Sequence, residues 1–229
     1  MTEDWFRSPG WDDDARGDYE RRLARARPHN RPQYLKIKAL ALRDAGQPEA
    51  AAELLHRALE TPGVYAFEAA HVTELLGDLR RQAGDVAGAE RLYRQLLADG
   101  PSPNGTSGSI TISLAELLIE HAPGDQAAAE AAALLKDWEN VPQLQFDSQL
   151  FRWHVAHARL ALRVGDHDLA RRSAGVALEL SARGPQLPRH PTVGLVVTDD
   201  NTLAWLQGLL TPDPGPRKRW SRPRGRPDS

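Results

Sequence analysis

Two histidines, His154 and His157, stand three residues apart in the stretch FRWHVAHARLALRV and are the first candidates for chemistry. On a helix that spacing brings two imidazoles to the same side, where they could bind a metal ion together with His167 or His190. No glutamate stands between the pair in the manner of zinc proteases, and no third ligand has a convincing spacing. We favour the alternative that both histidines pack between helices, and we expect neither a metal nor another cofactor.

Two other stretches contain residue types that bind anions. Segment 104–108, NGTSG, precedes an expected helix, but it lacks the Lys-Ser/Thr ending of a phosphate-binding loop and no strand precedes it, so we interpret it as a linker. In the basic tail, Arg217–Arg226, cations could neutralise phosphates while Trp220 stacks on a base. A short basic tail also serves solubility. The alternative function is therefore a nucleic-acid-associated regulator that uses this tail and the arginine-rich helix 16–27.

The composition excludes several classes of protein. The 229 residues carry a net charge of −2, so bulk charge does not predict a nucleic-acid partner. Without cysteine there are no disulfides and no thiolate metal sites. The first residues, MTEDWF, are not a secretory signal, and no apolar run approaches the roughly 20 residues that span a bilayer. We expect a cytoplasmic protein. The sequence has no Ser-His-Asp order and no nucleophile elbow, so we expect no enzyme.

The elements that must position these residues are predicted to be helices. Stretch 76–101, LGDLRRQAGDVAGAERLYRQLLADGP, indicates a helix, a turn at Gly84 and a second helix. Apolar residues recur at helical spacing in the second helix, and the small Gly77 marks a place where the two helices come close. The turn pattern recurs at Gly46, Gly124 and Gly165, so the four successive turns, with Gly84 second, are 38, 40 and 41 residues apart.

Four helix-turn-helix units at intervals near 40 predict an all-α solenoid. Residues 1–30 are expected to form an N-terminal arm and capping helix. The arm contains Trp5 and Trp11, which either pin it to the first helix or mark an interface. Residues 31–210 should form the repeat domain, which ends in a short capping helix near 201–210. Residues 211–229 are rich in proline and charge and should be disordered.

The repeated pattern resembles tetratricopeptide repeats. The resemblance depends on Leu76-Gly77, Gly84-Asp85, Ala89, Tyr93 and Pro101, and on the late copy Gly165-Asp166, Ala170 and Ala177. The DWFRS…W start and the PRHPTVGL end further resemble a group of uncharacterised bacterial tetratricopeptide proteins. The resemblance implies a right-handed superhelix of about four helix pairs plus capping helices, with a partner-binding concave groove lined by the first helix of each pair.

Carrying this geometry over predicts which residues line the groove. The predicted binding residues are Lys36, Arg43, His71, Arg81, Arg152, Arg159 and Arg163, accompanied by Gln33, Leu40, Glu74, Asp78 and Val155. Because guanidinium groups bind carboxylates through paired hydrogen bonds, an acidic peptide or protein segment is the expected partner. The alternative is that these are ordinary solvated helix residues. Leu40 and Asp78 stand where a chaperone-type carboxylate clamp needs asparagine, so we do not expect that partner.

Overall fold

The computed structural model describes residues 4–62, 65–100, 105–140 and 145–211, and within these ranges the chain is helical with no strand. Its elements are α1 (Asp13–Arg25), a 3-10 turn η1 (Pro28–Asn30), α2 (Arg31–Asp44), α3 (Pro48–Glu60), α4 (Ala66–Gln82), α5 (Val86–Asp99), α6 (Ile110–His121), α7 (Asp125–Asn140), α8 (Asp147–Arg163), α9 (His167–Ser181) and α10 (Asp200–Leu210).

Local sequence signals start and stop these helices. The carboxylates of Asp85 and Asp166 accept the backbone N–H groups of Gly88 and Leu169, which caps α5 and α9. Between α4 and α5, Gly84 adopts a φ of 78°, a left-handed conformation that costs other residues energy. The equivalent glycines 46 and 165 have φ values of 75° and 80°. The turn signals in the sequence therefore correctly placed these three tight turns, and Gly124 between α6 and α7 also has a positive φ, of 88°.

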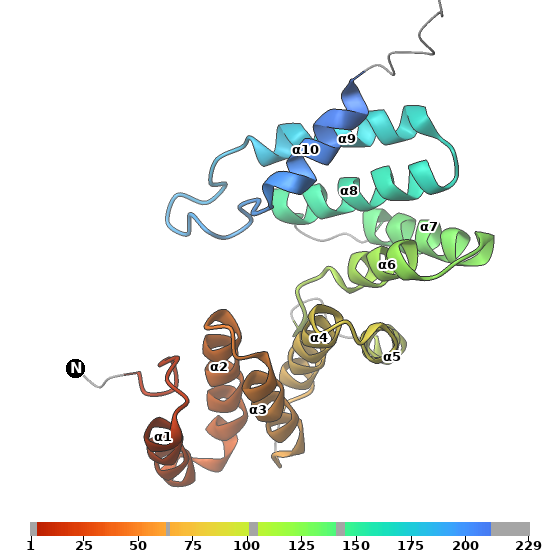
Figure 1. Ribbon diagram of the computed structural model, residues 1–229. Helices are drawn as coiled ribbons and strands as arrows, with labels where there is room; N and C mark the ends of the chain where they lie inside the picture. Colours follow the sequence, from red (N-terminus) through yellow and green to blue (C-terminus); the bar gives the residue numbers. More distant parts are fainter. Residues whose placement is uncertain (1–3, 63–64, 101–104, 141–144, 212–229) are drawn as a thin grey trace, which may run out of the picture.

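Helices pack as antiparallel pairs, and each pair stacks on the next (Figure 1). The pairs are α2–α3, α4–α5, α6–α7 and α8–α9, while α10 packs on α9 and covers the end of the stack. This arrangement confirms the predicted all-α solenoid of four helix pairs. No helix of the described residues is long and apolar enough to cross a membrane.

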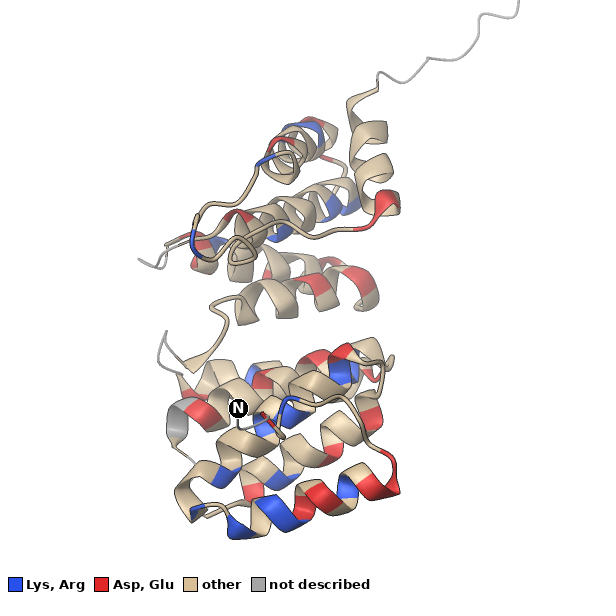
Figure 2. Ribbon diagram, turned by 90° about the vertical axis from the view of Figure 1, so that its left-hand side faces the viewer, with Lys and Arg blue, Asp and Glu red and all other residues tan. Residues whose placement is uncertain are grey.

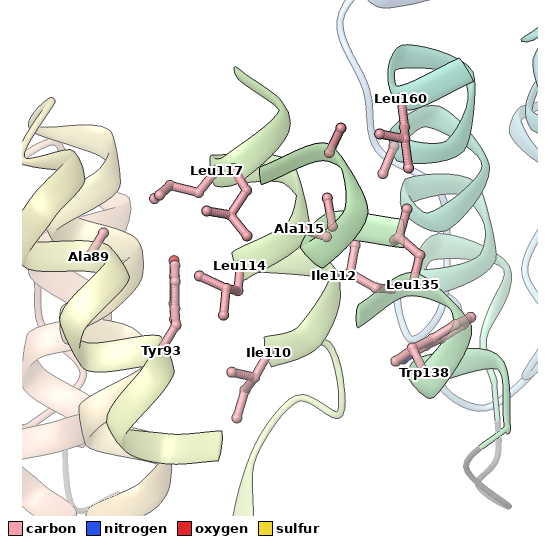
Figure 3. Close-up of a cluster of buried hydrophobic side chains, with 14 of the residues drawn as sticks. Ala89, Tyr93, Ile110, Ile112, Leu114, Ala115, Leu117, Leu135, Trp138 and Leu160 are labelled. Carbon is pink, nitrogen blue, oxygen red and sulfur yellow. The ribbon is translucent and has the colours of Figure 1, made fainter. Parts of the chain in front are cut away.

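Apolar residues shared by neighbouring pairs hold the stack together. In the central cluster, Tyr93 of α5 lies against Leu114 and Leu117 of α6, and Leu135 and Trp138 of α7 extend the contact towards α8 (Figure 3). The Trp138 indole N–H donates to the Gly108 carbonyl at 2.7 Å, so the ring is buried without an orphaned donor. Because no single pair encloses its own core, the pairs depend on one another for stability.

The N-terminal arm folds onto the first two helices. Lys38 of α2 is 1% exposed, and its ammonium group donates to the carbonyl oxygens of Ser8 at 2.6 Å and Gly10 at 2.8 Å. The ammonium also lies 5.2 Å from the Trp11 ring centroid, within cation–π range. Burial lowers the pKa of Lys38. The arm therefore supplies the acceptors that this buried cation needs.

The connection between the third and fourth pairs is short, because α7 continues to Asn140 and α8 begins at Asp147. Gln149 explains the early start of α8, because its side-chain oxygen accepts the Phe146 N–H at 3.0 Å and completes half of a capping box.

Candidate functional site

The first helices of the four pairs, α2, α4, α6 and α8, form the surface that the sequence predicted to bind a partner, which we call the first-helix face. Figure 2 shows basic and acidic residues side by side on the helices of the N-terminal half. The structure divides the predicted binding residues into two groups. Those on α8 and at the end of α4 have protein partners, whereas two of those on α2 and α4 have none in the part of the chain that the structure describes.

Glu116 of α6 is the centre of the C-terminal group. Glu116 is 8% exposed, and its carboxylate accepts hydrogen bonds from Arg81 at 2.6 Å and from Arg152 at 2.8 and 3.2 Å. The Nη2 group of Arg152, which donates to Glu116, also donates to the Ser113 hydroxyl at 3.0 Å. Two of the predicted partner-binding arginines are thus already bound to one buried carboxylate.

The charges in this cluster favour one another's ionised forms. Burial alone would raise the pKa of Glu116, but the guanidinium groups of Arg152 and Arg81 outweigh burial and hold that pKa below its ordinary value. Burial would lower the pKa of each arginine, and Glu116 instead raises both. The cluster therefore stays charged at neutral pH.

The other two arginines of α8 also have partners on α6. Arg159 donates to Glu120, which also accepts from Arg81 at 3.0 Å. Arg163 donates to the carbonyl oxygens of Leu118 at 3.0 Å and of Gly124, so it covers the C-terminal end of α6. That position suits a cation, because the last carbonyl groups of a helix carry partial negative charge.

The N-terminal group remains open. Among the described residues, Lys36 of α2 and His71 of α4 have no hydrogen-bond or ion-pair partner, and both are half-buried. Arg43 donates twice to its neighbour Asp44, at 2.8 and 2.9 Å. Burial lowers the pKa of His71, the positive charges of Lys36 and Arg43 lower it further, and Asp78 opposes them. Two predicted binding residues of α2, Lys36 and Arg43, thus interact electrostatically with a third, His71 of α4.

The acidic residues of α4 face different partners. Asp78 accepts the Tyr93 hydroxyl at 2.7 Å, which ties α4 to α5. Glu74 is 4% exposed and accepts the Ser107 N–H at 2.7 Å and the Ser107 hydroxyl. Burial raises the pKa of Glu74, although the hydrogen bonds from Ser107 partly oppose it. The loop that resembled a phosphate-binding segment therefore binds a carboxylate of its own chain.

A hollow of about 430 Å³ adjoins the arginine cluster. One wall comes from the helices and the other from the segment that leads into α10. Val155, which the repeat geometry placed on the first-helix face, is 7% exposed and packs with Leu206 of α10. The lining residues are Arg81, Glu116, Ser148, Phe151, Arg152, Val155, Arg159, Leu195, Val196, Val197, Thr198, Asp199 and Thr202.

The histidine pair lies away from this hollow, on the side of α8 that packs against α7. His154 Nδ1 and His157 Nε2 are buried without hydrogen-bond partners, and the Trp153 ring contacts both imidazoles. No cluster of three or more His, Asp or Glu in the described part of the chain could hold a metal. Burial lowers the pKa of His154 to about 4, and the pKa of His157 also falls.

This histidine pair should make stability depend on pH. Because the folded-state pKa of His154 is about 4 and its ordinary value is 6.5, the unfolded chain binds more protons between these values. Stability should therefore fall as pH decreases from 6.5 to 4. Chemical denaturation across this range should show that the free energy of unfolding depends less on pH in His154→Phe than in the wild type. His56→Gln, on the exposed side of α3, should follow the wild type. Parallel curves for wild type and His154→Phe would contradict this role.

Sequence reasoning assigned no binding-face residues to the third pair, where Glu116 and Glu120 lie. Gly124 directly precedes α7, whereas the other turn glycines stand one residue further from the second helix. Aligning the units on their glycines therefore shifts the register of α6. The spacing of the two glutamates, four residues on one helix, was the available signal that they share a face. The basic tail, Arg217–Arg226, lies outside the described residues.

Comparison with known proteins gives little beyond the geometry. Protein-family models and curated proteins were both searched without a match. Among solved structures, the chain is similar to a thermophilic TPR (tetratricopeptide repeat) protein of Thermus thermophilus, with 21% identity over 65% of this chain and 74% of that chain. The TM-score is 0.49, which is too low to support an argument, so the solenoid assignment rests on the packing of the helix pairs.

Proposed function

We propose that the chain is a non-catalytic binding module that holds an acidic segment of a partner protein against the N-terminal half of its first-helix face. The observation that supports this proposal most strongly is the pair Lys36 and His71, which interact electrostatically and have no hydrogen-bond or ion-pair partner among the described residues. Half-buried donors of this kind gain more from a bound carboxylate than solvated surface cations do.

The contrast within the first-helix face favours this half as the anion site. Arg81, Arg152 and Arg159 each donate to Glu116 or Glu120, so these two carboxylates already offset part of their positive charge. Asp78, the acid that acts on His71, accepts a hydrogen bond from the Tyr93 hydroxyl. A partner carboxylate placed between α2 and α4 would therefore meet the positive charge of Lys36, which no acid among the described residues pairs with.

Charge reversal tests this proposal. The probe is a fluorescein-labelled decamer of glutamate, followed by fluorescence anisotropy in low salt. Lys36→Glu combined with His71→Glu should weaken binding at least tenfold, since each change replaces an attractive contact by a repulsive one. The control is Lys136→Glu, which repeats the charge reversal of Lys36→Glu at an exposed position on α7 and should leave binding within twofold of the wild type. An undetectable decamer, or equal loss in both variants, would refute the anion site.

A further inference from the structure

The segment that leads into α10, residues 195–198, lies outside the helices and lines the hollow beside α8. Val196 packs against the apolar cluster under α10, while Val197 is 87% exposed. One of these two neighbouring side chains is therefore covered by the protein and the other faces solvent. The sequence LVVT also consists of residues that favour extended backbone.

The segment is fixed at both ends. The carbonyl oxygen of Gly194 accepts the Ser148 N–H at 3.0 Å, which joins the start of the segment to α8. Asp199 caps α10 by accepting the Thr202 N–H at 2.9 Å and the Thr202 hydroxyl at 2.8 Å. Between these anchors, the peptide groups of residues 195–198 make no hydrogen bond to any other described residue. A short segment is thus held in place at both ends with its peptide groups unpaired, and such groups can pair with an added strand.

The hollow beside this segment contains arginine N–H groups that have no hydrogen-bond acceptor among the described residues. Arg159 engages only one of its nitrogens with Glu120, and its guanidinium lies 5.5 Å from the Trp205 ring centroid. One terminal nitrogen of Arg152 is free among the described residues. The two acids of the lining, Glu116 and Asp199, already accept hydrogen bonds from their own chain. The remaining hydrogen-bonding capacity of the hollow therefore suits an acceptor with negative charge.

We propose that residues 195–198 form a docking edge to which an extended acidic segment of a partner protein adds as a second strand, with carboxylates directed to Arg152 and Arg159. Backbone hydrogen bonds would supply affinity, and the arginines would select the sign of charge. This site differs from the one between α2 and α4, and it does not depend on Lys36 or His71.

The test uses the full chain and the peptide (Val-Glu)₅ as probe, with (Val-Lys)₅ as the charge control. Alternating residues favour an extended peptide and place all its acids on one face. We expect (Val-Glu)₅ to bind at least tenfold more tightly than (Val-Lys)₅. Hydrogen exchange followed by NMR should slow at the amides of residues 195–198 on binding. The variant with Lys36→Glu and His71→Glu should keep this slowing, which separates this site from the first one.

Two proline variants identify the paired edge. Successive peptide N–H groups of a strand point to opposite edges, so Val197→Pro and Thr198→Pro remove donors from different sides. One variant should weaken (Val-Glu)₅ binding about fivefold, which corresponds to one hydrogen bond, and the other should not. Thermal melts check that both remain folded. Equal effects in the two variants, unchanged exchange at 195–198 with peptide bound, or a dimer of the free chain that Val197→Pro dissociates would each overturn the proposal.

Discussion

Replacing Glu116 by alanine should lower the free energy of unfolding by about 3 kcal/mol or more. The change would leave Arg81 and Arg152 in a partly buried place without the carboxylate that holds both. An uncompensated charge of this kind costs several times more than a broken surface ion pair. Urea denaturation at pH 7.5 measures the loss directly.

The neighbouring Glu120 provides the matched control. It contacts Arg81 and Arg159 from a position where its side chain is 27% exposed, compared with 10% for Glu116. Glu120→Ala should therefore cost about 1 kcal/mol at most. A double variant that replaces both Glu116 and Arg152 by leucine should recover part of the loss, because it also removes a buried charge. A loss below 1 kcal/mol for Glu116→Ala would show that water, not Glu116, compensates these arginines.

Replacing Gly77 by leucine should destabilise the chain by about 3 kcal/mol, and replacing it by alanine by about 2 kcal/mol. A Cβ atom at Gly77 would lie 2.7 Å from Cε1 of Tyr93, which is closer than real contacts allow. The Tyr93 ring cannot easily yield, since it is fully buried and its hydroxyl is bound by Asp78. The contact lies between the two helices of one pair, so the loss should appear in the cooperative unfolding of the stack.

Gly175 of α9 separates this effect from the usual preference for alanine over glycine in helices. A Cβ atom there would meet nothing within 4 Å. Gly175→Ala should therefore stabilise the chain by about 0.5–1 kcal/mol. If Gly77→Ala stabilised the chain to a similar degree, the close approach of α4 and α5 would not be real.

Much of the fold could be predicted from sequence because its signals are local. Gly84 with Asp85 specifies a turn and a cap in adjacent residues, and Gly77 marks the close approach to Tyr93. These features recur along the chain, so an error in one unit can be corrected by comparison with another. The α6–α7 turn, where Gly124 stands one residue nearer to the second helix, was the exception.

The candidate site was less accessible to sequence reasoning because charge pairing is a long-range property. Arg152 and Glu116 are 36 residues apart, and no local pattern says that one neutralises the other. The same holds for Val155, which is buried in one apolar cluster with Leu206 of α10. The segment that brings α10 to this place has no repeat pattern in its sequence. Sequence placed Lys36 and His71 on the same face, but whether they have partners among the described residues depends on the side chains of neighbouring helices.

The most direct measurement of the central claim is the pKa of the His71 imidazole, obtained by NMR titration in the free chain and in the presence of saturating glutamate decamer. Burial and the charges of Lys36 and Arg43 hold this pKa below its ordinary value in the free chain. A carboxylate bound beside the ring would favour the imidazolium, so the pKa should rise on binding, and affinity should increase as pH falls from 7.5 to 5.5. A decamer that binds and leaves the pKa of His71 unchanged would contradict the proposed position of the acidic partner.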